Sequence, residues 1–201
     1  MLNTSNSWIQ THKGHKFFPY KNTSIVDIRD IAHSLSLLCR FNGHCKQFYS
    51  VAQHSVLVAS ACGEGKEHDT PPFGVENRYL ELAKWGLLHD AMEAYLGDTP
   101  SPLKSDEREF LELSLLNNIG AKLGLKELPF EGKKVIANND KRMLVTEKRD
   151  LMAVDIPWGD WTTSYEPFKF TIHPLGPEEA EKLFLSRFDE LFDLMDLLDV
   201  Y

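Results

Sequence analysis

The apolar positions of this chain recur mainly at intervals of three and four residues, which is the period of an α-helix. In the segment 27–39, for example, Ile28, Ile31 and Leu35 fall on one face. Alternating segments that would indicate β-strands are scarce, so the pattern predicts an all-α fold. We expect helices over residues 27–39, 49–62, 79–96, 107–123 and 133–154, and a last one from about 178 to 198.

Three segments lack the helical period, and we expect irregular structure in each. Residues 1–21 are polar and aromatic. Residues 63–74 are rich in glycine, proline and charge, which is typical of an exposed loop. Residues 157–177 carry many aromatic and proline side chains, which indicates an ordered loop. The length suits one compact domain that covers the whole chain, residues 1–201.

Composition and charge restrict the partners of the protein. The formal net charge is −8, whereas a protein that binds duplex nucleic acid normally needs a basic face. The chain lacks the roughly twenty consecutive apolar residues that span a bilayer, and its first residues lack the order of a signal peptide. Cys39, Cys45 and Cys62 are odd in number, which favours reduced thiols. We therefore expect a cytoplasmic protein with a small phosphate ester as substrate, and neither nucleic acid nor a membrane as partner.

An adjacent histidine and aspartate, His89 and Asp90, lie on the most apolar predicted helix. A buried carboxylate is costly unless it is paired or binds a metal, and imidazole with carboxylate is a usual ligand set for divalent ions. Glu93 projects from the same helical face, four residues after His89. Taken alone, the pair also fits a core histidine that is bonded to its neighbour. His54, on the apolar side of its own helix, and Asp140, on a later helix, favour a metal site.

The order His, His-Asp and Asp on separate helices resembles the signature of the HD-domain phosphohydrolases. The resemblance covers residues 27–155 and is carried mainly by YSVAQHSVLVA at 49–59 and HDAMEAYLGDTPSPLK at 89–104. The chain is similar to two kinds of member: the small 5′-deoxynucleotidases, and the dATP triphosphohydrolases of phages that replace adenine in their DNA.

The resemblance implies a single HD domain, a helical bundle with a divalent ion at its centre. The ion would be Mn²⁺, Co²⁺, Zn²⁺, Fe²⁺ or Mg²⁺, because histidine and aspartate ligands accept all of them. Residues 27–155 would form the core around the metal, and the helix 178–198 would complete the core or form an oligomer contact. The implied ligands are His54, His89, Asp90 and Asp140.

The resemblance also implies roles for three residues beside the metal. Glu93 would orient or deprotonate a water molecule, and Asp98 would assist as a second general acid–base. Lys104 would meet a phosphate group as a point charge. Two alternatives remain open: Asp98 also fits a turn residue that follows a glycine, and Lys104 also fits a solvated surface lysine.

Two neighbouring residues, Arg40 and Phe41, resemble an Arg-Trp pair of the bacterial 5′-deoxynucleotidases, with a one-residue gap before His54. In that family the pair contacts phosphate and crowds the 2′ carbon of the sugar, so the phenyl ring would exclude a ribose hydroxyl. Equally, Arg40 fits a cap of the preceding helix and Phe41 fits the core. Pro102 matches a proline that packs on adenine in the phage enzymes, although a loop after a helix also favours proline.

The resemblance leaves three functions open. The leading one is a dATP triphosphohydrolase, in which Lys133, Lys134 and Lys141 near Asp140 would meet the triphosphate. The second is a 5′-deoxynucleotidase that acts on monophosphates. The third is a non-catalytic regulatory domain with a closed structural metal, which would have no use for Glu93. Family members are commonly homo-oligomers, and the apolar stripe of the last helix is a core face or a subunit contact.

Overall fold

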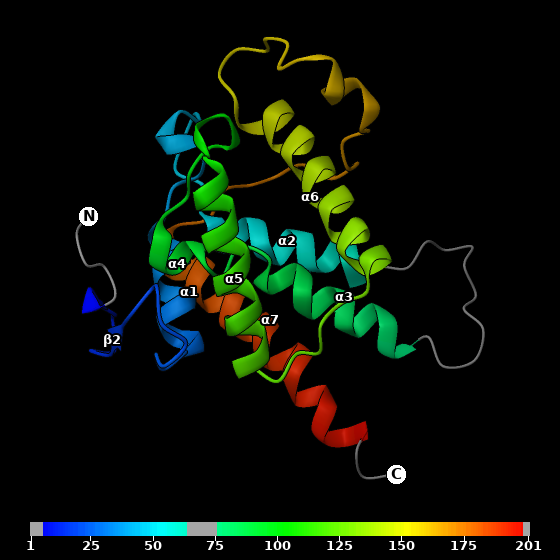
Figure 1. The fold of residues 1–201 in the computed structure, drawn as a ribbon. Coiled ribbons are helices and arrows are strands. Elements are labelled where there is room, and N and C mark those ends of the chain that lie inside the picture. Colours follow the sequence, from blue (N-terminus) through cyan, green and yellow to red (C-terminus); the bar gives the residue numbers. More distant parts are fainter. Residues whose placement is uncertain (1–5, 64–75, 199–201) are drawn as a thin grey trace.

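The chain folds into a mostly helical structure, which confirms the coarse fold class expected from the sequence (Figure 1). The computed structural model describes residues 6–63 and 76–198, so the loop expected at 63–74 lies outside the described residues apart from its first position. The α-helices are α1 (Ile28–Leu37), α2 (Val51–Gly63), α3 (Glu76–Leu88), α4 (Glu93–Leu96), α5 (Asp106–Lys122), α6 (Phe130–Leu151) and α7 (Pro177–Leu198). The 3-10 helices are η2 (Arg40–Gly43), η3 (Ser101–Leu103) and η4 (Asp160–Ser164).

Polar caps and an apolar face explain where α1 and α5 form. The Asp27 side chain accepts a backbone N–H of the first turn of α1, and Ser105 does the same for α5. Each cap satisfies a donor that the start of a helix leaves without a partner. Ile31 and Leu35 on the apolar face of α1 are fully buried. The two helices expected at 27–39 and 107–123 are therefore confirmed, with ends that differ by one or two residues.

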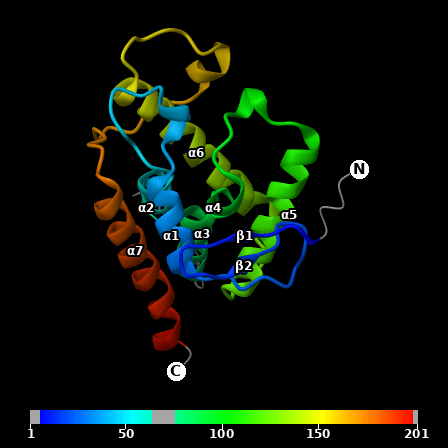
Figure 2. The ribbon, with the colours of Figure 1, turned by 90° about the vertical axis from the view of Figure 1, so that its left-hand side faces the viewer.

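Helix α2 lies in the middle of the molecule, and α1, α3, α6 and α7 pack against it (Figures 1 and 2). In Figure 2, α5 and α7 lie on opposite sides of the α2–α3 pair. Residues 51–56 of α2 are all buried, including His54. At Gly86 of α3 a Cβ atom would lie 3.1 Å from Ala59 Cα, so the two helices approach closely there. This approach brings the end of α3, with His89, beside His54.

The helix expected over 79–96 is interrupted in the structure by a turn at 89–92, which separates α3 from α4. The His89 ring contacts the backbone at this break. Its Nδ1 lies 2.7 Å from the carbonyl oxygen of Gly86, the oxygen that the Asp90 N–H would bond in a continuing helix. The expectation of one continuous helix is therefore wrong, and the interruption falls at the candidate metal ligands.

The N-terminal segment, expected to be irregular, contains a short hairpin. Strand β1 (Ile9–Gln10) pairs with β2 (Lys16–Phe17) in antiparallel register. Phe17 is buried, and its ring stacks on that of Tyr95 at a centroid distance of 3.6 Å. Each strand has two residues, which is too short for an alternating pattern to appear in the sequence.

The segment between α6 and α7, all of which the structure describes, contains no α-helix, as expected for an ordered loop. The Arg149 guanidinium donates to the carbonyl oxygens of Phe168 and Phe170 at 2.7 and 2.6 Å, which ties this loop to α6. On α7, Phe184 and Leu191 are buried, so this part of the apolar stripe is a core face. Among the described helices, none has both the length and the apolar character of a membrane span.

Candidate metal centre

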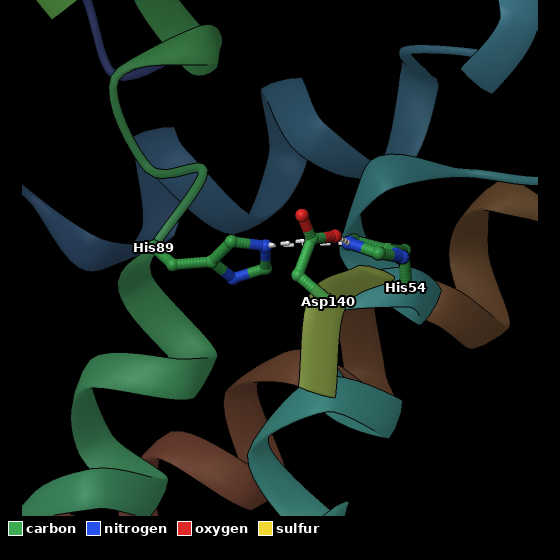
Figure 3. A group of neighbouring side chains, drawn as sticks. All are labelled: His54, His89 and Asp140. Carbon is green, nitrogen blue, oxygen red and sulfur yellow. Dashed lines mark hydrogen bonds and ion pairs between the residues drawn. The ribbon is translucent and has the colours of Figure 1, made fainter. Parts of the chain in front are cut away.

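Side chains from α2, α6 and the turn after α3 converge at one point. His54 on α2 is fully buried, and its Nε2 lies 3.2 Å from His89 Nε2. Asp140 Oδ1 on α6 lies 3.2 Å from His54 Nε2 and 3.9 Å from His89 Nε2, and Figure 3 shows its carboxylate between the two rings. Asp90 Oδ2 lies 3.2 Å from His89 Nε2 and 3.6 Å from His54 Nε2. The structure thus brings His54, His89 and Asp140 into one group, and Asp90 lies beside the two histidines but outside that group.

The spacing of these atoms fits a divalent ion. Ligand bonds of about 2.1 Å put neighbouring ligand atoms roughly 3.0 to 3.4 Å apart in octahedral or tetrahedral geometry. Three of the distances above are 3.2 Å. The facing atoms of His54, His89 and Asp140 all lie within 4.8 Å of one another, so this group can hold a metal ion. Two imidazole nitrogens and carboxylate oxygens are also a suitable donor set for such an ion.

Hydrogen bonds on the far side of each ring define which nitrogen faces the centre. His54 Nδ1 donates to Glu147 Oε1 at 2.6 Å, and His89 Nδ1 donates to the Gly86 carbonyl oxygen at 2.7 Å. A neutral ring that donates from Nδ1 carries its lone pair on Nε2. Two such lone pairs would face each other at 3.2 Å, which is repulsive unless a cation, either a proton or a metal ion, lies between them. Metal-binding histidines are held in this way by an acceptor behind the ring.

The charges around the centre favour a bound cation. Burial acts to raise the pKa of Asp90, but the His89 ring holds this pKa well below its usual range. Burial and the Arg40 charge act to lower the pKa of His54, yet Glu147 and the hydrogen bonds to its carboxylate neighbours raise it to about 9. In both cases the oppositely charged neighbours prevail over desolvation, which keeps Asp90 ionised and favours positive charge at His54, so the centre attracts positive charge.

Glu147 is a site residue that sequence reasoning missed. It is fully buried and accepts hydrogen bonds from His54 Nδ1, from the Tyr49 hydroxyl at 2.9 Å and from Arg40 Nε at 3.2 Å. These bonds fix the orientation of the His54 ring. A signal existed in the sequence, because Glu147 follows Asp140 by seven residues on α6 and two helical turns return to the same face.

Arg40 lies beside the centre, with one guanidinium nitrogen 3.6 Å from Asp90 Oδ2 and another 3.2 Å from Glu147 Oε2. It therefore joins the network of the candidate ligands and does not cap α1. Phe41 is half-buried and packs against the core, and its ring centroid lies 5.8 Å from that of Trp158. Its φ of 58° is in the left-handed region, a strained conformation that persists where the surroundings hold it in place.

The two candidate catalytic carboxyl groups lie close to Asp90. Glu93 is buried, and among residues 6–63 and 76–198 no group donates a hydrogen bond to its Oε2. Burial and the charges of Asp90 and Asp98 raise the pKa of Glu93, and burial raises that of Asp98. Arg108 holds the turn before Asp98, since its NH2 donates to the carbonyl oxygens of Leu96 and Gly97.

Lys104 and Pro102, expected to meet the substrate, differ in their surroundings. The Lys104 ammonium donates to Glu112 Oε2 at 2.7 Å, and Arg108 donates to the other oxygen of this carboxylate. Lys104 is therefore neither a solvated lysine nor a free cation. Its charge still acts to lower the pKa of Glu93. Pro102 is exposed on η3.

A second cluster near the N-terminus combines His15, Asp27 and Asp30, whose facing atoms also lie within 4.8 Å of one another. Hydrogen bonds within the N-terminal segment explain why these side chains lie together. Asp30 accepts from the Lys13 N–H at 2.6 Å and lies 3.1 Å from His15 Nδ1, while Asp27 caps α1. The cluster ties the N-terminal hairpin to α1.

Two known proteins are similar to this chain. The uncharacterized protein YfdR of Escherichia coli is 35% identical over 195 residues, which cover 94% of this chain and 97% of YfdR. An uncharacterized protein of Rhodobacter capsulatus is 38% identical over 82 residues, which cover 40% of this chain and 37% of that protein. No family model matches the sequence. The chain belongs to the same family as YfdR.

Proposed function

We propose that this protein is a metal-dependent phosphohydrolase of the HD type that acts on 2′-deoxynucleotides. The observation that carries the proposal is the pair of Nε2 atoms of His54 and His89, 3.2 Å apart, with both Nδ1 hydrogens already donated elsewhere. Asp90 and Asp140 border this point with carboxylate oxygens. A divalent ion held there would offset the charge of phosphoryl oxygens and lower the pKa of water.

The neighbouring side chains can do the remaining chemistry of hydrolysis. Water attacks phosphorus, and the bond from phosphorus to the leaving oxygen breaks. Glu93 would take the proton of the attacking water once the positive charges of the bound ion and of Arg40 lower its raised pKa, and Asp98 would return a proton to the leaving oxygen. Arg40 would orient the phosphate group, because its guanidinium already lies 3.6 Å from Asp90.

A regulatory domain with a structural metal is the alternative from another class. A structural site closes its coordination sphere with protein ligands. Such a site gives no reason to bury Glu93 with an oxygen that lacks a hydrogen-bond donor within the described part of the chain. An enzyme needs a carboxylate of this kind, so this observation supports hydrolysis.

The number of phosphate groups on the substrate separates two candidate activities. The sequence resemblance favours dATP, which requires several free cations. Lys104 is bound to the buried Glu112, Lys133 pairs with Glu127 at 2.8 Å, and the Lys141 ammonium lies over the Tyr165 ring. Only the Lys104 pair is largely buried, so Lys104 is held away from a triphosphate, which is the specific argument for the second candidate, a 5′-deoxynucleotidase that acts on monophosphates.

A nucleotide panel tests the proposal and ranks the substrates. The purified protein is incubated with dATP, dAMP, ATP and AMP in Mn²⁺ or Co²⁺, and the products are resolved as phosphate or triphosphate. We expect hydrolysis that depends on the metal and prefers the deoxy sugars. Failure to hydrolyse any of these compounds with either ion would contradict the proposed function.

A further inference from the structure

A cavity of about 310 Å³ opens beside the candidate metal centre, between α3, α5 and α6. His89 and Asp140 form part of its wall, so the cavity and the metal centre share two residues. The three helices can be followed in Figures 1 and 2. None of the sequence patterns indicates this cavity, because its walls come from three separate segments.

Much of the cavity wall is apolar. The Trp85 ring, which is held by a hydrogen bond from its Nε1 to the Lys126 carbonyl oxygen at 2.9 Å, lines the cavity. Leu116 and Ile136 line it from α5 and α6. The Asn117 side chain supplies an amide, which both donates and accepts hydrogen bonds. The combined site thus has one half at the charged metal ligands and one half that is mainly apolar, with the Asn117 amide and the Lys133–Glu127 ion pair as its polar groups.

The size of the cavity limits what it can hold. Its volume lies at the lower end of the range for small-molecule sites, roughly 300 to 1,000 Å³. A planar heterocycle fits such a space. Aromatic side chains stack on the faces of bases, and asparagine can bond the edge of an adenine.

We propose that this cavity holds the base of the nucleotide whose phosphate reacts at the metal centre, with Asn117 contacting the polar edge of the base. The inference rests on the proposed function, because it assigns the two halves of one substrate to the two halves of one site. Asn117 would then determine which base is preferred. The metal ligands and Glu93 would act on any phosphate ester whose phosphate reaches the metal centre.

The substitution Ala137→Leu tests the inference by filling the cavity. Ala137 lines the cavity from an exposed position of α6, and leucine is nearly as good a helix former as alanine, so the variant should fold. Ala121→Leu, at an exposed position of α5 outside the cavity lining, is the matched control. Binding of deoxyadenosine, which has no phosphate, is measured by ligand-observed NMR and by quenching of tryptophan fluorescence.

We expect the dissociation constant of deoxyadenosine to rise about 10- to 200-fold in Ala137→Leu and to stay unchanged in Ala121→Leu. The kcat/KM for dAMP should fall to the same extent, whereas that for 2-deoxyribose 5-phosphate, which lacks a base, should not change. Trp85→Phe should remove the fluorescence response, and Trp161→Phe, at an exposed position outside the lining, should keep it.

The possible outcomes distinguish this inference from the proposed function. If wild type does not bind deoxyadenosine, or if Ala137→Leu binds it as wild type does, the cavity does not hold the base. The same conclusion follows if Ala137→Leu lowers turnover of dAMP and of 2-deoxyribose 5-phosphate equally. If deoxyadenosine binds in the expected way but neither phosphate ester is hydrolysed with Mn²⁺, the cavity assignment stands and the proposed function fails.

Discussion

Replacing Glu147 by glutamine tests whether the residue behind His54 controls metal binding. The side chain keeps its shape but loses its negative charge. In the protein it accepts from His54, Tyr49 and Arg40, so all its neighbours in this network are donors. A glutamine has one acceptor oxygen, and its amide N–H groups would face at least one of these donors. The variant therefore leaves donors without an acceptor inside a buried network.

The loss of these hydrogen bonds should affect both metal affinity and the free energy of unfolding. Acceptors behind a metal-binding histidine are worth about 10- to 100-fold in metal affinity, so the dissociation constant of Mn²⁺ or Zn²⁺ should rise by that factor. Removing the charge of the fully buried Glu147 from its pair with Arg40 should also lower the free energy of unfolding by about 3 to 5 kcal/mol. Domains of this size are stable by about 5 to 15 kcal/mol, so we expect a folded variant at 25 °C.

Competition with a chromophoric chelator measures the metal affinity, and urea denaturation of metal-free protein measures the free energy of unfolding. Glu112→Gln is the matched control, because Glu112 is also buried and accepts from two cations, Lys104 and Arg108. It should lose stability and keep its metal affinity. Unchanged metal affinity in Glu147→Gln, or an equal loss in both variants, would refute the positioning role of Glu147.

Three further predictions concern catalysis, sugar preference and packing. Glu93→Ala should keep the metal but lower kcat by about two to four decades, and unchanged turnover at full metal content would exclude a general base at this position. Phe41→Ala should reduce the preference for dAMP over AMP, measured as a ratio of kcat/KM; a constant ratio would mean that Phe41 does not exclude the ribose hydroxyl. Gly120→Ala should lower the free energy of unfolding by about 1 to 3 kcal/mol, because its Cβ would lie 2.3 Å from the Trp85 ring; an unchanged urea midpoint would show that the ring moves freely.

Periodicity predicted the helices because their apolar faces are buried against one another. The segment 27–39 has its buried positions at Ile31 and Leu35, as an amphipathic helix requires. The break in 79–96, where the His89 ring bonds to the Gly86 carbonyl, was not predictable in this way. Such side-chain bonds to the backbone leave no trace in the apolar pattern.

The candidate ligands could be found from residue types, whereas their surroundings could not. An imidazole on an apolar face, as at His54, requires a partner wherever the helix is buried. The pairing of Lys104 with Glu112 depends on how η3 meets α5, and the sequence pattern gives no information on that contact. The same limit applies to the cavity beside Trp85, which forms only when three helices come together.

The most direct test of the central claim measures metal content and hydrolysis on the same sample. Protein stripped with a chelator is reloaded with Mn²⁺, freed of excess ion by gel filtration, and analysed by elemental mass spectrometry and by release of phosphate from deoxynucleotides. The account predicts a stoichiometric amount of metal in wild type, turnover in proportion to occupancy, and the loss of both in His89→Ala and Asp90→Ala. Full turnover in the stripped protein, or undiminished metal binding in these variants, would contradict it.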